Sequence, residues 1–349
     1  MPAYCAGTDQ GQVVLYSARG LDYWYSEVLS NFELDCKVRI FFADAASDQL
    51  LARLRTEAGR PYADVVIAEP PFISTAAAEN LLGTGGLPEA VGVAGDRCDR
   101  LRRWCTLVEN YASWTYDPAL DQPPPRTWDD LLAAPYHQQV LTSRPDRGLD
   151  GFAALELLTH TLGEDAAFAY LRQLEGSVSA HYQTTDVMSR VESLGGARAA
   201  NGDLQENLND IDQFVNLGIW FPTSAGSAPA TLALPFGAAT VRGGHNPKNA
   251  HALLAYLWSA DAQRLVGRSY VAPSRSGVVP TDDRSLRLRA LLAGVTVMRL
   301  DWEAEAAAQQ RLTDRWLAFR AAPDATIPAL PSPSPLFPGV PPPSPRPSP

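Results

Sequence analysis

Short apolar runs alternate along the chain with stretches in which apolar side chains recur every three or four residues. The first pattern is typical of buried strands and the second of amphipathic helices. The strand-like runs are residues 13–20, 63–68, 107–116, 197–200 and 231–241. The helical stretches are residues 22–32, 74–82, 128–133, 186–194, 285–292 and 302–321. Because strands that alternate with crossover helices build parallel sheets, the pattern predicts an α/β fold.

Residues that favour helix ends mark several further boundaries. Ser47 can cap a helix that ends before Pro61, and Thr127 can cap the helix that follows it. Asn246 and Pro247 together predict another helix start, since proline is favoured at the first helical position.

Polar residues stand where several of the predicted strands end. The first strand ends in residues 17–20, and the strand at 63–68 leads into Glu69 and two prolines. We predict a turn at Asn201-Gly202-Asp203, which would place a carboxylate at the tip of a strand. Since ligands bind at the carboxyl edge of such sheets, these strand ends predict a ligand crevice.

Four pieces of sequence carry a resemblance to a known family, in that family's order. They are Leu15-Tyr16-Ser17-Ala18 with Gly20-Leu21 and Trp24-Tyr25; Ala63-Asp64-Val65 with Pro70-Pro71-Phe72-Ile73; Ala200-Asn201-Gly202-Asp203-Leu204-Gln205; and Leu234-Pro235-Phe236. The chain resembles type II solute-binding proteins of ABC importers, in the iron/phosphonate group, and is most similar to 2-aminoethylphosphonate-binding proteins. The likeness extends over residues 12–283. It implies a two-lobed periplasmic-binding-protein fold with a hinge and a central cleft.

The expected domain organisation follows from this fold and from composition. Residues 1–12 precede the first strand, residues 13–112 and 230–326 form a discontinuous first lobe, and residues 113–229 form the second lobe. We expect the chain to cross between lobes near residues 111–116. Residues 327–349 are expected to be a disordered tail, because 11 of the last 22 residues are proline and have little to bury.

The resemblance also implies which residues face the ligand. Asp203 is the candidate partner of a ligand ammonium group, with Glu69 as the next candidate. Hydroxyls, main-chain N–H groups and Arg19 would meet a phosphonate, and aromatic rings would form the walls. Besides Asp203, the candidates are Tyr16, Ser17, Ala18, Arg19, Phe72, Ser143, Thr184, Thr185 and Phe236. Each also has a simpler structural interpretation, as a turn residue, a helix cap or part of the core.

Function is expected to be capture of a small zwitterion and its delivery to an ABC permease in the membrane, without catalysis, cofactor or metal. The formal net charge of −10 and the absence of a long basic run argue against nucleic acid as a partner. We expect a monomer located in the periplasm or outside the cell. The first twelve residues show no signal peptide, so a removed signal, a misassigned start and a cytosolic protein all stay open.

Three alternatives remain at this stage. A ferric-ion or organic-anion binding protein would share the fold, although the paired tyrosines of ferric-binding relatives are replaced here by Asn-Gly-Asp. An enzyme on this fold could use Cys36 or Cys105 as a nucleophile. A cell-surface interaction protein that lost its ligand would fit the proline-rich tail.

Four cysteines are too few for a disulfide scaffold. Cys98 and Cys105 can form a local disulfide if the segment between them turns. If it is helical, their Cα atoms lie roughly 10 Å apart, which is too far. Four free or partly buried thiols are the alternative.

Overall fold

The computed structural model describes residues 2–9, 11–121, 123–185, 187–213, 215–224 and 226–321 of the 349. The expected tail at 327–349 lies outside the described residues. The strands are β1 Gly11–Ala18, β2 Val38–Ala45, β3 Val65–Ala68, β4 Cys105–Tyr116, β5 Val140–Ser143, β6 Val178–Tyr182, β7 Ala199–Asp203, β8 Gly218–Trp220, β9 Ala230–Thr240, β10 Ala272–Pro273 and β11 Thr296–Met298. The α-helices are α1 Asp22–Cys36, α2 Ser47–Glu57, α3 Phe72–Ala78, α4 Leu149–Leu162, α5 Glu164–Leu174, α6 Met188–Val191, α7 Leu204–Asp212, α8 Pro247–Leu257, α9 Ala260–Gln263, α10 Asp283–Leu292 and α11 Glu305–Ala321.

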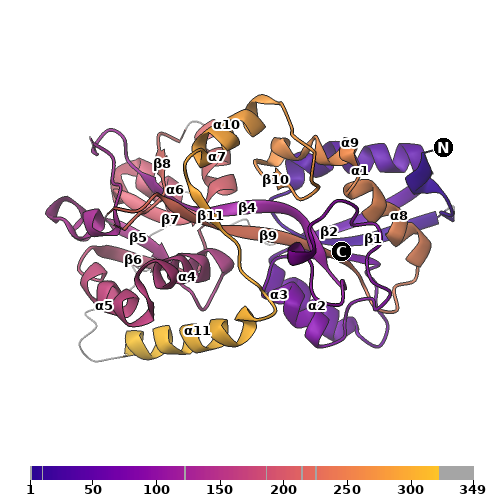
Figure 1. Ribbon diagram of the computed structural model, residues 1–349, viewed down its shortest axis with the longest axis horizontal. Helices are drawn as coiled ribbons and strands as arrows, with labels where there is room; N and C mark the ends of the chain where they lie inside the picture. Colours follow the sequence, from indigo (N-terminus) through magenta and orange to yellow (C-terminus); the bar gives the residue numbers. More distant parts are fainter. Residues whose placement is uncertain are drawn as a thin grey trace, which may run out of the picture.

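The molecule is elongated and consists of two α/β lobes joined by two long strands (Figure 1). The sheet order is β2-β1-β3-β9-β4-β7-β5-β6. Strands β1, β2 and β3 are parallel, β9 runs antiparallel to β3 and β4, and β5 is parallel to β6 and β7. The α/β fold and its two lobes are therefore as the sequence predicts.

Strand β4 belongs to both lobes because its partner changes along its length. It pairs with β9 from Cys105 to Tyr111 and with β7 from Ala112 to Tyr116. The change falls between Tyr111 and Ala112, inside a strand that is buried almost throughout. A single strand therefore aligns the first lobe with the second.

Each lobe has its own apolar centre. In the second lobe, Trp128 meets the Trp114 ring edge-on at 5.8 Å between centroids, and Trp220 lies 5.9 Å from Trp114 on another side. In the first lobe, Trp24 is fully buried and donates its indole N–H to the carbonyl of Ala262 at 2.9 Å. These rings occupy the spaces between sheet and helices that fix how each lobe packs.

The predicted helix boundaries are partly confirmed. Thr127 caps a short 3₁₀ helix at Trp128–Leu132 through a capping box with Asp130, and Pro247 is the first residue of α8. Ser47 begins α2 but does not cap it, because its hydroxyl instead donates to Glu69 Oε2 at 3.1 Å. Asn246 likewise uses its side chain on Asp64 rather than on the helix that it precedes.

The predicted Asn-Gly-Asp turn is wrong. Asn201 and Gly202 continue β7 and pair with Trp114 and Ser113 of β4, and only Asp203 ends the strand. Strand pairing outweighs the local turn preference here.

The sequence analysis missed several strands, of which β2 and β6 are the longest, and placed one helix differently. β2 is half exposed at the sheet edge, so it lacks the continuous apolar run of a buried strand, and the short β6 is only partly buried. Helix α11, which the sequence groups with the first lobe, lies beneath α4 and α5 of the second lobe in Figure 1. There Arg315 pairs with Glu164 at 2.6 Å.

All four cysteines are in disulfides, which corrects the alternative of free thiols. Cys5 is bonded to Cys36, with their Cα atoms 5.1 Å apart, and Cys98 to Cys105, with their Cα atoms 4.0 Å apart. The local disulfide forms because the intervening residues turn, so that Cys98 and Cys105 face each other as an antiparallel bridge. Neither candidate thiol nucleophile is therefore free. Within the described residues, every helix is too short or too polar to cross a bilayer.

We predict that the disulfide between Cys5 and Cys36 stabilises the protein more than the one between Cys98 and Cys105. It closes a separation of 31 residues rather than 7, and a longer loop loses more entropy when cross-linked. Replacing both cysteines of a pair by serine should cost about 2–4 kcal/mol, with roughly 1 kcal/mol more for the longer loop. Urea unfolding of the two double variants measures this, and the opposite order would show that loop length does not decide the difference.

Candidate functional site

A cavity of about 490 Å³ lies between the two lobes. The end of β1, the start of α2 and the start of α3 contribute its first-lobe wall, through Arg19, Ser47 and Phe72. The starts of α4 and α7 contribute the second-lobe wall, through Asp150 and Glu206. The size suits a small organic ligand.

Carboxylates crowd one part of this cavity. Oxygen atoms of Asp150, Asp203 and Glu206 all lie within 4.8 Å of one another, and Glu69 also lines the cavity. Like charges at such distances repel strongly where water is scarce. The cluster therefore favours a cationic group of a ligand.

Asp203 is held in place by three elements. It ends β7 and is the N-cap of α7, accepting the N–H of Glu206 at 2.8 Å. The same oxygen accepts a hydrogen bond from the Asn110 side chain of β4 at 2.7 Å. The Asn110 side chain itself accepts a hydrogen bond from the N–H of Gln205 at 3.1 Å. Strands β4 and β7 and helix α7 therefore position one carboxylate together.

The hydroxyl of Thr185 lies between two carboxyl groups of the cluster. It lies 2.8 Å from Asp150 Oδ2 and 2.8 Å from Glu206 Oε2. A hydroxyl has one proton to donate, so the second contact requires a proton on a carboxyl group. Burial, with the charges of Asp203, Glu69 and Glu206, raises the pKa of Asp150 well above its usual range. Asp150 therefore favours its protonated form more than an ordinary aspartate does.

Glu69 faces the cluster from the first lobe. Burial, and to a smaller extent the charge of Asp203, raise the pKa of Glu69 to about 7, while the hydrogen bond from Ser47 acts in the opposite direction. Glu69 is therefore partly protonated near neutral pH and would ionise fully when a ligand cation arrives.

Cationic and main-chain groups also line this cavity. Arg19 and Arg147 both line the cavity, and the side chain of each is more than half exposed. Arg19 is paired with Asp44 and Arg147 with Asp146. Gly148 and Leu149 begin α4, whose first N–H groups have no partner within the helix. Such a helix start, with an arginine beside it, favours an anionic group.

Gln205 connects the two lobes at the edge of the cavity. Its side-chain N–H groups donate to the carbonyl of Gly20 at 2.7 Å and to that of Ser269 at 2.5 Å. Gly20 has φ +104°, and a Cβ there would lie 2.5 Å from Gln205 Oε1. A glycine is thus required for both the turn and the contact.

Most of the residues that the sequence singles out line this cavity. They are Ala18, Arg19, Phe72, Thr184, Thr185, Asp203 and Phe236. Whether each one touches a ligand stays a prediction.

The structure places the other three candidates outside the lining of the cavity. The Tyr16 ring packs under Arg53, and its hydroxyl donates to Glu57, so it faces α2 instead of forming a cavity wall. Ser17 is fully buried against Tyr25. Ser143 accepts a hydrogen bond from Asn201 at 2.8 Å and packs inside the second lobe. Side chains along a strand point to one face of the sheet or the other, so these three do not point toward the strand tip.

The sequence analysis missed Asp150, Glu206, Asn110 and Arg147. Asp150 and Arg147 flank Gly148 at the start of α4, and a glycine between charged residues before an apolar helical stretch was the available signal. Glu206 follows Asp203 by three residues at the start of the same helix, and this capping-box spacing was an available signal. Asn110 has no local signature and reaches the site because β4 pairs with β7.

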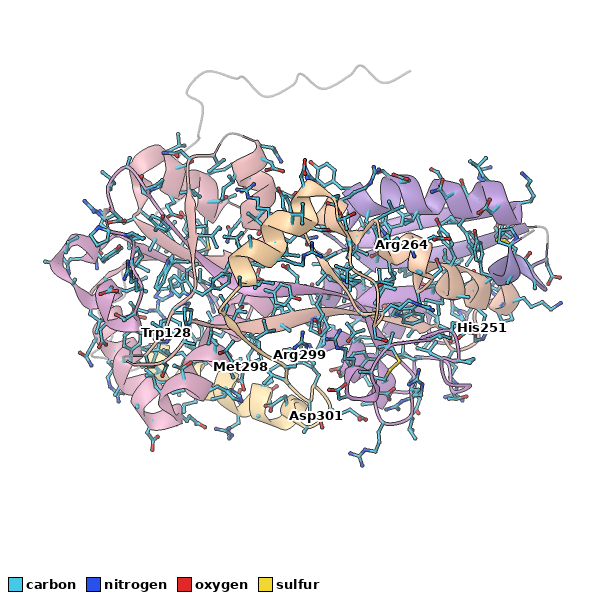
Figure 2. All side chains as sticks on the ribbon, turned by 45° about the horizontal axis from the view of Figure 1, so that its top comes forward. Trp128, His251, Arg264, Met298, Arg299 and Asp301 are labelled. Carbon is cyan, nitrogen blue, oxygen red and sulfur yellow. A yellow bond between two sulfur atoms is a disulfide. The ribbon has the colours of Figure 1, made fainter. Side chains whose placement is uncertain are left out.

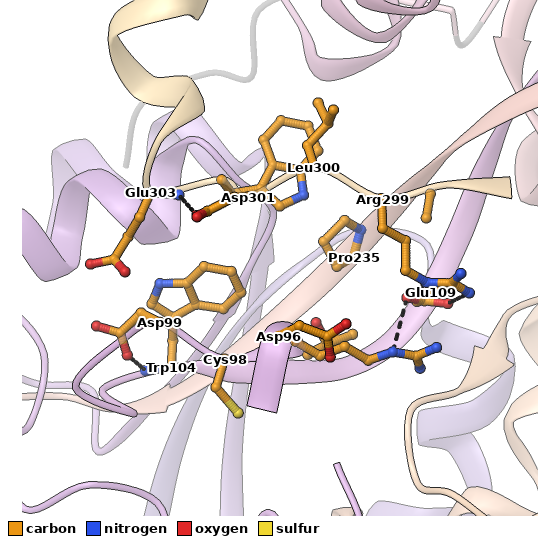
Figure 3. A pocket seen from close by; sticks show the side chains of 14 residues that line it. Asp96, Cys98, Asp99, Trp104, Glu109, Pro235, Arg299, Leu300, Asp301 and Glu303 are labelled. Carbon is orange, nitrogen blue, oxygen red and sulfur yellow. Dashed lines mark hydrogen bonds and ion pairs between the residues drawn. The ribbon is translucent and has the colours of Figure 1, made fainter. Parts of the chain in front are cut away.

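A second hollow, beside β4 and β9, is filled by ion pairs (Figure 3). Glu109 of β4 accepts two hydrogen bonds from Arg299, at 3.0 and 2.9 Å, and Arg97 lies 3.7 Å from it. The space of about 40 Å³ holds at most a few waters. Its central carboxylate, Glu109, is already paired with arginines, so the larger cavity between the lobes is the candidate site.

Solved structures of similar shape have the same two-lobed architecture. AfuA of Actinobacillus pleuropneumoniae, a periplasmic binding protein solved with fructose-6-phosphate, aligns over 90% of this chain and 100% of its own, with a TM-score of 0.75 and 17% identity. The apo ferric ion-binding protein A of Pasteurella haemolytica aligns over 88% of this chain and 98% of its own, with a TM-score of 0.72 and 19% identity. At these identities the likeness shows the fold alone.

Sequence comparison gives the family. A protein of Salmonella typhi, provisionally named a 2-aminoethylphosphonate-binding periplasmic protein, is 30% identical over 310 residues, which are 87% of this chain and 91% of that protein. A protein of the same name from Salmonella typhimurium matches equally well. The family described as bacterial extracellular solute-binding protein matches residues 13–270. With the two-lobed fold and the cavity between the lobes, these matches show that the chain belongs to the bacterial extracellular solute-binding proteins.

Proposed function

We propose that this protein captures a small zwitterion of the 2-aminoethylphosphonate kind and delivers it to an ABC permease. The observation that carries the proposal is that one cavity presents a cluster of carboxylates together with two arginines and the start of α4. The names of the Salmonella relatives point to the same ligand.

In this proposal the ammonium group binds between Glu69, Asp150 and Asp203. These carboxylates come from both lobes, so a cation between them would draw the lobes together and relieve their repulsion. The phosphonate would meet Arg147 and the start of α4 on one side and Arg19 on the other. The hydroxyl of Thr184 lies within reach of the same region.

A ferric site of the tyrosine type finds no support in this cavity. Within the described part of the chain its lining includes no tyrosine, histidine or cysteine. The second candidate is instead a cation without an anionic group, either a diamine or a divalent metal. Six carboxylates against two arginines favour it, and Asp150, Asp203 and Glu206 have the spacing of metal ligands.

We expect 2-aminoethylphosphonate to bind far more tightly than either of its halves. Ethylphosphonate leaves the carboxylates without a partner, which costs about 2–5 kcal/mol, or roughly 30-fold to several thousand-fold in affinity. Calorimetry with 2-aminoethylphosphonate, ethylphosphonate and putrescine tests this. Equal affinity for the first two would overturn the zwitterion, and tightest binding of putrescine would favour the diamine.

Dialysis against a chelator should leave the affinity for 2-aminoethylphosphonate unchanged, and a marked loss would favour a metal in the cluster.

Asp203→Asn should weaken zwitterion binding by about two to three orders of magnitude, from the lost pairing of charges. Stability should change by less than about 0.5 kcal/mol, because asparagine caps helices as well as aspartate does. The matched control is Asp282→Asn, which alters the N-cap of α10 by the same chemistry and is not part of the cavity lining. If Asp203→Asn binds within threefold of the wild type, Asp203 is only a cap and Glu69 becomes the main partner.

Glu69→Gln should stabilise the ligand-free protein at pH 8 but not at pH 5. The pKa of Glu69 is raised to about 7 in the folded state, so ionising it costs stability as pH rises from its unfolded value through 7. Removing that charge should gain about 1–3 kcal/mol at pH 8. Urea unfolding at the two pH values measures the difference, while zwitterion affinity should fall. An equal effect at both pH values would show that Glu69 ionises normally.

A further inference from the structure

The C-terminal helix α11 meets the second lobe along α4 and α5. Trp316 is buried there, 6.3 Å from the His181 ring, and Arg320 pairs with Glu175 at 2.6 Å. Arg315 pairs with Glu164, the first residue of α5, at 2.6 Å. These contacts are all made by the middle and end of α11. The start of the helix meets a different set of groups on α4.

Three potential metal ligands lie together at that start. Glu156 and His160 stand one turn apart on α4, and Glu305 is the first residue of α11. One ligand atom from each lies within 4.8 Å of the other two. A pair of ligands four residues apart on one helix face is a recurrent way of binding a metal ion. Here the third ligand comes from a separate helix, so the site would bridge α4 and α11.

Glu156 supplies an independent indication that something is bound. Its side chain is only 3% exposed, and its Oε2 has no hydrogen-bond partner among the described residues. Its other oxygen lies 3.1 Å from Nδ1 of His160, and that nitrogen also lies 3.1 Å from the Glu156 carbonyl. A buried carboxylate oxygen without a partner costs free energy that a bound cation would recover.

The ligand set favours a divalent transition metal. Two carboxylates and a neutral imidazole carry a charge of −2, and such mixed nitrogen and oxygen ligands suit zinc. Ligand atoms on one zinc lie roughly 3–4 Å apart, so the cluster must contract by about 1 Å, which rotation of the His160 side chain, 38% exposed, allows. The charge of Arg311 also acts on Glu156, but Arg311 is paired with Glu164.

We propose that Glu156, His160 and Glu305 form a zinc-type site that fastens the start of α11 to α4. It lies apart from the cavity between the lobes and does not depend on the ligand bound there. Three protein ligands leave the remaining coordination positions to water. The bound metal would fix where α11 begins, and with it the segment that leads to α11 from Arg299 and Asp301, both labelled in Figure 2.

The test is zinc binding by the full chain and by His160→Gln and Glu305→Gln. After treatment with a chelator, the wild type should bind one zinc ion at this site, and a concentration about 100-fold above Kd should raise Tm by about 4 °C. Both variants should lose at least tenfold in zinc affinity and most of the Tm shift. Hydrogen exchange in the first turns of α11 should slow with zinc in the wild type only.

The matched control is His251→Gln. His251 lies on α8 in the other lobe (Figure 2), is 43% exposed and pairs with one carboxylate, Glu89, at 2.8 Å. It should bind zinc as the wild type does. Zinc that binds instead at Asp150, Asp203 and Glu206 would be unaffected by the two site variants and would leave exchange in α11 unchanged. That result, or no binding at all, would overturn the proposal.

Discussion

The exchange of partners along β4 is the constraint on which the rest of the structure depends. Up to Tyr111 this strand is hydrogen bonded into the first lobe, and from Ala112 into the second. The pairing of Ala112 with Asp203 places the end of β7 beside the crossing, and Asn110 then holds the Asp203 carboxylate. The site is therefore built at the hinge itself, where a change in the angle between lobes alters the distances among its charges.

Repulsion among carboxylates gives this hinge a stored electrostatic cost. Helix starts offset part of it, because Asp150 lies in the first turn of α4 and Asp203 caps α7. Protons offset another part, as the raised pKa values of Asp150 and Glu69 show. Functional sites commonly contain arrangements that destabilise the ligand-free protein, and this carboxylate cluster is one of them. A cation that replaces the protons would be bound most strongly when the lobes are closest.

The two disulfides and helix α11 hold parts of the chain that lie outside the sheet. One disulfide fixes the N-terminal segment to the end of α1, and the other closes the loop before β4. Both fit the oxidising surroundings of proteins outside the cytoplasm, to which this family belongs. At the other end of the chain, α11 returns to the second lobe and covers α4 and α5 (Figure 1).

The sequence by itself determined the α/β class, the two lobes and the strand ends that carry the site. Apolar periodicity and the short polar segments after the strands are local properties, and local properties can be read from one stretch at a time. The resemblance singled out Phe72, Thr185 and Asp203, and these residues line one cavity in the structure. The predicted turn at Asn201-Gly202 was wrong, because long-range pairing with β4 decides the conformation of that segment. Only the tertiary structure turned Tyr16 away from the cavity and brought Asp150 to Asp203 and Glu206, since the repulsion between carboxylates of α4 and α7 depends on the distance between separate helices.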